Sequence, residues 1–255
     1  MNLLEAVFLG IVQALTEWLP ISSSGHLVLV QQLLGLSPPL IFDAMLHLGT
    51  LIVVILIFAR DILRILRCFV RLDFKSEYGR LGLFLIVGSI PVGVFGLGFR
   101  RFFESLFYSL SAVAFAFIVT GFILFFTKRG MGGRELGLWD SILVGIAQGV
   151  AIAPGISRSG STIGVGIMRG VKKEVAVKYS FLLSIPAILG AMVVEMTDLV
   201  WEIDLATILV GTIVSMVVGF LSFKLLLNVI NRGRLHQFAY YCWAMGIIAL
   251  IMSIV

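Results

Sequence analysis

Residues 13–26 read QALTEWLPISSSGH, a helical apolar pattern that stops at Pro20 and restarts behind three consecutive serines. The surrounding apolar region, Leu3–Leu34, exceeds the roughly 20 residues that one bilayer crossing needs, yet it is broken in the middle. Irregular backbone is tolerated inside a membrane where protein or a water-filled cavity surrounds it. The stretch therefore predicts a re-entrant pair, two short helices that enter the membrane and return to the same side.

The same pattern returns 135 residues later in the chain. Residues 145–161 match residues 10–26 at seven of 17 positions, where average composition predicts about one match. The second break lies in the apolar region Leu138–Met168, which predicts a second re-entrant pair. The identical pairs are Gly10/Gly145, Ile11/Ile146, Gln13/Gln148, Ile21/Ile156, Ser22/Ser157, Ser24/Ser159 and Gly25/Gly160.

The composition excludes a soluble protein. Apolar residues make up 60% of the 255 residues and charged residues 13%, whereas soluble domains carry roughly 25% charged residues. The net charge of +5 is typical of cytoplasmic loops in a multi-pass membrane protein, and we expect no nucleic-acid partner. The two cysteines, Cys68 in a charged loop and Cys242 in an apolar run, are interpreted as free thiols.

Six runs are long and apolar enough to be transmembrane helices. Each half of the chain then holds a re-entrant pair followed by three spans, so residues 1–134 form a first repeat and residues 135–255 a second one. Because three is odd, the second repeat enters the membrane upside down, and the expected fold is an all-α inverted-topology repeat forming one membrane domain. The predicted spans are Leu40–Ala59, Leu81–Phe99, Ser105–Thr127, Tyr179–Val194, Leu205–Phe223 and Gln237–Val255.

This topology sorts the basic residues strongly. Sixteen Lys and Arg residues fall on one side, and only Arg100 and Arg101 fall on the other, while Arg158 lies in the second break. Basic loops face the cytoplasm. The sequence therefore predicts a protein of the cell (inner) membrane with both termini outside.

The first break gathers groups suited to phosphate chemistry. Gln13 and Glu17 are four residues apart and share one helical face. An ionisable residue inside a membrane segment indicates function by default. Three serines, Ser22, Ser23 and Ser24, can cap the next helix at an end that favours anions, and His26 falls in its first turn.

The second break adds a cation to another serine-rich cap. Arg158 lies between Ser157 and Ser159, and a guanidinium binds phosphate through two parallel hydrogen bonds. Together the breaks predict a phosphate-cleaving pocket, in which Glu17 is a general base or metal ligand and His26 or a serine attacks or moves protons. Gln148 and Thr162 are expected near the substrate.

Structural roles remain open for the individual members. The serines can be plain helix caps, His26 an interhelical hydrogen-bond donor, and Arg158 with Glu17 a buried ion pair. Asp43 and His47 are also four residues apart within a span and could line the pocket, but the sequence gives them less support.

At these two motifs the sequence resembles the undecaprenyl-diphosphate phosphatase family, also known for bacitracin resistance. In that family a (Glu/Gln)-x-x-x-Glu stretch leads into Pro-x-Ser-Ser-x-Gly-His, and a second motif reads Pro-Gly-x-Ser-Arg-Ser-x-x-Thr. The resemblance covers essentially the whole chain. The matching residues are Gln13, Glu17, Pro20, Ser22, Ser23, Gly25 and His26, then Pro154, Gly155, Ser157, Arg158, Ser159 and Thr162.

The resemblance implies a membrane enzyme that converts undecaprenyl diphosphate to the monophosphate, recycling the lipid carrier for cell-wall synthesis and giving bacitracin resistance. It also implies a divalent cation, Mg²⁺ or Ca²⁺, with Glu17 as its ligand, and membrane lipids as partners; a homodimer is compatible with it. The first position of the family's (Glu/Gln)-x-x-x-Glu motif is Gln13 here, and an amide cannot act as a second ionised carboxylate. The implied catalytic residues are Glu17, His26, Arg158 and Ser23, and the substrate-binding residues are Gln13, Ser22, Ser24, Gln148, Ser157, Ser159 and Thr162.

Two other classes of membrane protein share part of this pattern. Type-2 phosphatidic-acid phosphatases need an Arg-Pro element, which this chain lacks. A polyprenyl-phosphate transporter or flippase stays open as the alternative, because inverted repeats with broken helices are typical of transporters.

Overall fold

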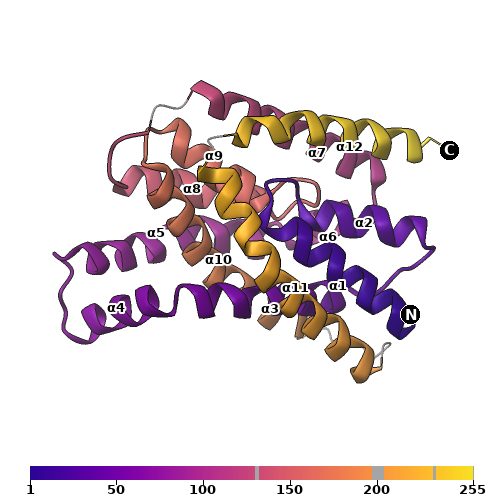
Figure 1. Cartoon of the computed structure of the whole chain (residues 1–255), viewed down its shortest axis with the longest axis horizontal. Helices are drawn as coiled ribbons and strands as arrows, with labels where there is room; N and C mark the ends of the chain where they lie inside the picture. Colours follow the sequence, from indigo (N-terminus) through magenta and orange to yellow (C-terminus); the bar gives the residue numbers. More distant parts are fainter. Residues whose placement is uncertain (130–131, 197–203, 232–233, 255) are drawn as a thin grey trace.

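The computed structural model describes residues 1–129, 132–196, 204–231 and 234–254. Within these ranges the regular structure is helical, apart from one isolated bridge between Arg134 and Val171 (Figure 1). The first half holds α1 (Leu3–Trp18), α2 (Ser23–Leu33), α3 (Leu40–Ile57), α4 (Ala59–Val70), α5 (Glu77–Gly98), α6 (Arg100–Phe107) and α7 (Leu110–Phe126). The second half holds α8 (Leu138–Val150), α9 (Arg158–Met168), α10 (Lys173–Met196), α11 (Leu205–Asn231) and α12 (Phe238–Met252).

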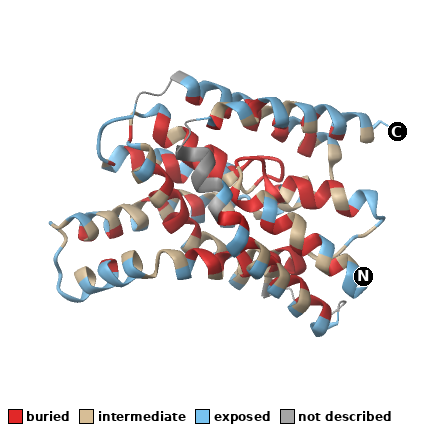
Figure 2. Ribbon diagram, viewed as in Figure 1, coloured by how far each residue is buried: buried red, intermediate tan, exposed pale blue. Residues whose placement is uncertain are grey.

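Five helices of the described chain are long and apolar enough to cross a membrane, and they confirm a multi-pass membrane protein. They correspond to α3, α5, α10, α11 and the helix that ends the described chain. Each overlaps a span expected from the sequence. Figure 2 shows exposed residues along their outer surfaces, many of them large and apolar, such as Leu56 and Ile90.

The expected span Ser105–Thr127 is wrong in its first part. Its first residues belong to the short α6, and α6 and α7 together pass as a sixth span only with a bend of 101° between them. α6 ends at Phe107, and the Ser109 side chain starts the next helix, because its hydroxyl accepts a hydrogen bond from the Ala112 N–H at 3.3 Å as the N-cap of α7.

The charged loop expected around Cys68 is also wrong, because α4 continues the line of α3 after a break at Phe58. Ile65 is buried within α4, and Phe69 packs against the α5 backbone at Gly82, where an added Cβ would lie 2.3 Å from the ring. Apolar contacts on one face therefore hold this stretch as a helix, while its arginines remain exposed.

Two helical hairpins, α1–α2 and α8–α9, meet tip to tip in the middle of the molecule (Figure 1). The Gly155 N–H donates to Ser22 Oγ at 3.1 Å, and the Ser159 hydroxyl donates to the Leu19 carbonyl at 3.2 Å. Gly155 has a φ of +96°, and a Cβ on Gly25 would lie 2.8 Å from the Gly155 Cα. The glycines of both motifs therefore allow the two tips to touch.

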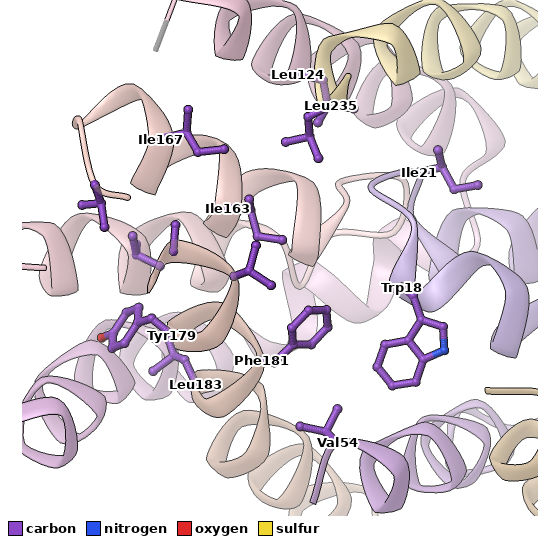
Figure 3. Packing of buried hydrophobic residues seen from close by; sticks show 14 of the residues in the cluster. Trp18, Ile21, Val54, Leu124, Ile163, Ile167, Tyr179, Phe181, Leu183 and Leu235 are labelled. Carbon is purple, nitrogen blue, oxygen red and sulfur yellow. The ribbon is translucent and has the colours of Figure 1, made fainter. Parts of the chain in front are cut away.

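The hairpins are fixed by an aromatic core where α1, α10 and α11 meet (Figure 3). Trp18 is buried, its indole N–H donates to the Gly219 carbonyl at 2.9 Å, and its ring lies 5.7 Å from Phe181 and 5.2 Å from Phe223. Such aromatic pairs contribute about 0.5–1.5 kcal/mol each beyond the area they bury. The core therefore sets the position of Glu17, the residue before Trp18.

Candidate functional site

A cavity of about 680 Å³ lies where the two hairpin tips meet. It is lined by both breaks and, in addition, by α3, α5 and α10. The residues expected at the site that line it are Glu17, Ser22, Ser23, Ser24, Gln148, Ser157, Arg158 and Ser159.

Two of these serines cap helices, as their positions predict. Ser22 Oγ accepts from the Gly25 N–H at 3.3 Å and starts α2, and Ser157 Oγ accepts from the Gly160 N–H at 3.0 Å and starts α9. Both helix N-termini therefore lie at the cavity wall, and such N-termini carry partial positive charge. The cavity end is electrostatically suited to an anion.

Glu17 is the centre of the site. Its carboxylate Oε1 accepts a hydrogen bond from Arg158 Nη2, and its Oε2 accepts from the Ser23 hydroxyl at 2.5 Å and from Gln13 Nε2 at 3.1 Å. The Glu17 side chain is 6% exposed. The structure thus brings together four residues that the sequence singled out, from three helices and both halves of the chain.

Arg158 keeps one donor without a protein partner. Its Nη1 atom is buried and has no hydrogen-bond partner in the described chain, while Nη2 is held by Glu17. The guanidinium lies 5.6 Å from the ring centre of Phe181, a cation–π contact that keeps its plane in place. An anion in the cavity is the ligand that this arrangement would satisfy.

The structure places His26 away from the cavity lining. Its Nδ1–H donates to the Ser22 carbonyl at 2.7 Å, and its Nε2 pairs with the Tyr241 hydroxyl at 2.8 Å. The ring also packs edge-on to Phe117, with the centroids 5.3 Å apart. His26 therefore joins α2 to α7 and α12, and its predicted role in the reaction stays a prediction.

Two further predicted residues make packing contacts. Gln148 lines the cavity but donates through Nε2 to the Leu183 carbonyl at 3.0 Å, which leaves its buried Oε1 without a partner in the described chain. Thr162 lies outside the described lining, where its hydroxyl donates to the Arg158 carbonyl at 2.7 Å and contacts Ser180 at 2.5 Å. Thr162 therefore supports the first turn of α9.

Asp43 and His47, which the sequence supported less, both line the cavity. His47 Nε2 lies 3.5 Å from Glu17 Oε2, and its Nδ1–H donates to the Asp43 carbonyl at 2.8 Å. The Asp43 carboxylate accepts from Gln31 Nε2 at 2.7 Å. The sequence signal that favours a functional role for both residues is the rarity of ionisable side chains within a membrane span.

Within the described residues, no group of three or more His, Cys, Asp or Glu side chains forms a metal site. Glu17 nonetheless offers one carboxylate at the cavity. Gln13, on the same helix face, is fully buried and lies outside the described cavity lining, and its Oε1 has no hydrogen-bond partner among the described residues. Mg²⁺ usually binds through one or two carboxylates together with substrate phosphates. The oxygen donors therefore fit a cation that is shared with a phosphate ligand.

The cavity has a second charged end, away from Glu17. Arg100, Glu104 and Glu195 also line it. Arg100 Nε donates to Glu104 Oε1 at 2.5 Å, and Arg100 Nη2 lies 3.8 Å from Glu195 Oε1. Apolar and glycine residues of α5 and α10 line the space between the two ends.

Comparison with known proteins shows the family of this chain. Residues 6–248 match the family described as "Bacitracin resistance protein BacA". The undecaprenyl-diphosphatase of Carboxydothermus hydrogenoformans is 44% identical, with 99% of this chain and 98% of the relative covered. Those of Halothermothrix orenii and Korarchaeum cryptofilum are 42% and 43% identical, covering 99% and 97% of this chain and 99% and 98% of the relatives. The chain belongs to the BacA bacitracin-resistance family.

Proposed function

We propose that this protein is an undecaprenyl-diphosphatase, a membrane enzyme that hydrolyses undecaprenyl diphosphate to undecaprenyl phosphate and inorganic phosphate. Relatives of that name match the chain over nearly its whole length. The single observation that carries the proposal is the Arg158 guanidinium: its buried Nη1 has no hydrogen-bond partner among the described residues, while its Nη2 donates to Glu17, which also accepts from the Ser23 hydroxyl. The product would return the lipid carrier to cell-wall synthesis and lower sensitivity to bacitracin.

The side chains of this site can divide the reaction among them. Arg158 and the N-termini of α2 and α9 hold the terminal phosphate and stabilise its charge. Glu17 takes the proton of the Ser23 hydroxyl, 2.5 Å away, and the Ser23 oxygen forms a bond to the terminal phosphorus. The anhydride P–O bond breaks, undecaprenyl phosphate leaves, and water then releases phosphate from the serine.

A divalent cation, when bound, supplies charge neutralisation on the diphosphate. Glu17 would hold it through the carboxylate, which Gln13 Nε2 orients by a hydrogen bond. If so, chelation abolishes phosphate release, and added Mg²⁺ or Ca²⁺ restores it. Release that continues unchanged in chelator contradicts a cation at this site.

We also propose that residues 1–134 and 135–255 are inverted repeats, each a re-entrant pair with three spans. The meeting of α1–α2 with α8–α9 at their tips supports this, because inverted repeats place a site where two broken helices meet. The protein would reside in the cell (inner) membrane, in contact with membrane lipids, with its basic loops in the cytoplasm and both termini outside. A homodimer stays a prediction.

Hydrolysis is favoured over transport by the Ser23 contact with Glu17, since a transporter needs binding groups but no activated hydroxyl. The test uses the full-length protein purified in detergent, because transport requires two compartments and hydrolysis requires none. Phosphate release from undecaprenyl diphosphate is expected. Its complete absence in an otherwise folded sample contradicts the proposal.

The same sample identifies the nucleophile. Rapid quenching with labelled substrate should trap an acid-stable phosphoserine that is absent from Ser23→Ala, whereas Ser105→Ala, an exposed serine outside the described cavity lining, should retain it. An acid-labile phosphohistidine that disappears in His26→Ala would instead assign the attack to His26.

A further inference from the structure

A second apolar groove lies between α4, α5 and α10. It has a volume of about 630 Å³, and nearly all of its lining is aliphatic or aromatic. Its α5 wall is formed by Leu85, Ile86 and Ile90, and its α10 wall includes Leu182 and Ile185. Ile86 and Ile90 are 51% and 61% exposed, so the groove has room along this edge.

The groove and the catalytic cavity are neighbours along the same pair of helices. Ser89 of α5 and Pro186 of α10 line both spaces. In α10 the lining residues before Pro186 line only the groove and those after it line only the cavity. In α5 the groove lining extends one residue past Ser89, to Ile90, and the cavity lining continues from Val92 toward the end of the helix. The two spaces therefore follow one α5–α10 seam and meet at Ser89 and Pro186.

The meeting point itself is compatible with a hydrocarbon chain. The Ser89 hydroxyl donates to the Leu85 carbonyl of its own helix at 2.7 Å, so its polar proton is already satisfied. Pro186 has no backbone N–H to expose. No charged side chain lines the described groove, and charges begin at its border, where Lys178 contacts Asp61 at 3.0 Å.

The proposed substrate has two parts with opposite requirements. Its diphosphate needs the charged end of the cavity, at Glu17 and Arg158, and its long prenyl chain needs apolar surroundings. A chain that starts at the phosphates meets the apolar walls of α5 and α10 next, and the Ser89–Pro186 junction leads from these walls into the groove.

We propose that the groove between α4, α5 and α10 binds the distal part of the prenyl chain and gives the enzyme its preference for long chains. This inference rests on the proposed phosphatase function. The groove contributes substrate affinity only, because it lies apart from the reacting groups; it acts on KM for long chains and leaves the chemical step unchanged.

The test narrows the groove with a large side chain in the full-length enzyme. Ile86→Trp places an indole on the groove wall at an exposed position, and Ile90→Trp does the same one helical turn further on. Val94→Trp is the matched control, since Val94 is 58% exposed on the same helix and lines neither space. Each variant is assayed in detergent with undecaprenyl diphosphate and with farnesyl diphosphate.

Both groove variants are expected to raise KM for undecaprenyl diphosphate by about tenfold, the usual scale of a mismatch in a hydrophobic site. Their kcat, and their kcat/KM for farnesyl diphosphate, should stay within about twofold of wild type, as should Val94→Trp on both substrates.

Three results would contradict the proposed role of the groove in binding the prenyl chain while leaving the phosphatase function intact. They are an unchanged KM for the long substrate in both variants, an equal loss on both substrates, and an equal effect of Val94→Trp. Unchanged kinetics in both variants would assign the groove to ordinary membrane lipid. Failure of the phosphatase function is distinguishable, because the wild-type enzyme would then release no phosphate from either substrate.

Discussion

Glu17 accepts hydrogen bonds from side chains of α1, α2 and α9, and its neighbours depend on its charge. The carboxylate balances the guanidinium of Arg158 in a site that is largely closed to water. Removing one partner of such a pair costs about 3–5 kcal/mol, because the other charge is left uncompensated. The same carboxylate is the only group in hydrogen-bond contact with Ser23 Oγ among the described side-chain contacts.

Glu17→Gln should therefore lower kcat by about 100-fold or more, the scale of general acid–base catalysis, with a much smaller change in KM. The amide keeps the shape of the side chain but cannot take the serine proton. Phosphate release at saturating substrate measures the effect, with thermal unfolding to confirm that the protein is folded. Glu174→Gln, an exposed carboxylate on α10, is the control and should behave as wild type. A folded Glu17→Gln enzyme with normal kcat would contradict the role of Glu17 as general base.

Arg158→Lys keeps the positive charge but loses the fork that contacts Glu17 and a phosphate at the same time. We expect kcat/KM to fall by about tenfold or more, since one bidentate contact is replaced by a point charge. Arg101→Lys, at an exposed position, is the control, and it should retain wild-type activity because the same exchange is made away from the site. Near-wild-type turnover of Arg158→Lys would show that the free Nη1 donor does not bind substrate.

The sequence predicted the central residues of the site better than their surroundings. The contact between Glu17 and Arg158 follows from the sequence because each lies in the break of a repeated motif, and inverted repeats bring their breaks together. The partner of His26 could not be predicted in this way, since Tyr241 lies in the last helix, outside either motif. His47 was underestimated because a spacing of four does not show which face of a span meets the cavity.

At the scale of helices, the hairpin tips depend on glycine. Gly155 combines a φ of +96° with a would-be Cβ position 2.6 Å from the Val113 carbonyl oxygen, so any larger residue strains both the backbone and the packing. The contact matters for function because the Gly155 N–H holds Ser22 Oγ, the cap of α2.

Gly155→Ala is accordingly expected to destabilise the protein by about 1–3 kcal/mol, the cost of holding a residue in a sparsely populated backbone region. A lower midpoint of thermal unfolding in detergent measures it, and activity should fall as the two tips separate. Gly98→Ala is the control, because Gly98 lies at the end of α5 with open space around its Cβ position. Equal midpoints for the two variants would show that the tips do not need this turn.

The spans could be predicted from the sequence because apolar length alone identifies them, and five of them are present. The bend between α6 and α7 could not, since only Tyr108 and Ser109 separate the last apolar residues of α6 from α7, a gap too short to mark a change of direction in the sequence. The helix α4 could not be predicted either, because it is rich in charged residues. Its several arginines are typical of a charged loop, and the helix is stabilised by the packing of Ile65 and Phe69 on α5, which the sequence alone does not show.

At the scale of the molecule, both termini lie at one end and the α4–α5 turn at the other (Figure 1). α5 runs 22 residues, about 33 Å, away from that turn and delivers Arg100 toward the end that holds the termini. We therefore expect a released phosphate to reach water at this end of the cavity, where the side chains of Arg100, Glu104 and Glu195 are partly exposed. Which side of the membrane receives the phosphate follows from the topology.

Cysteine labelling in intact cells determines that side. In a Cys68→Ser, Cys242→Ser background that retains phosphatase activity, Lys75→Cys in the α4–α5 turn should react with a membrane-impermeant maleimide only after the cells are opened. Ser253→Cys, exposed near the C-terminus, should react in intact cells, because the arginines of α4 favour a cytoplasmic location for the opposite end in the proposed topology. Labelling of both positions from the same side would contradict the inverted repeat. Labelling of Lys75→Cys alone in intact cells would reverse the orientation and direct the phosphate into the cytoplasm.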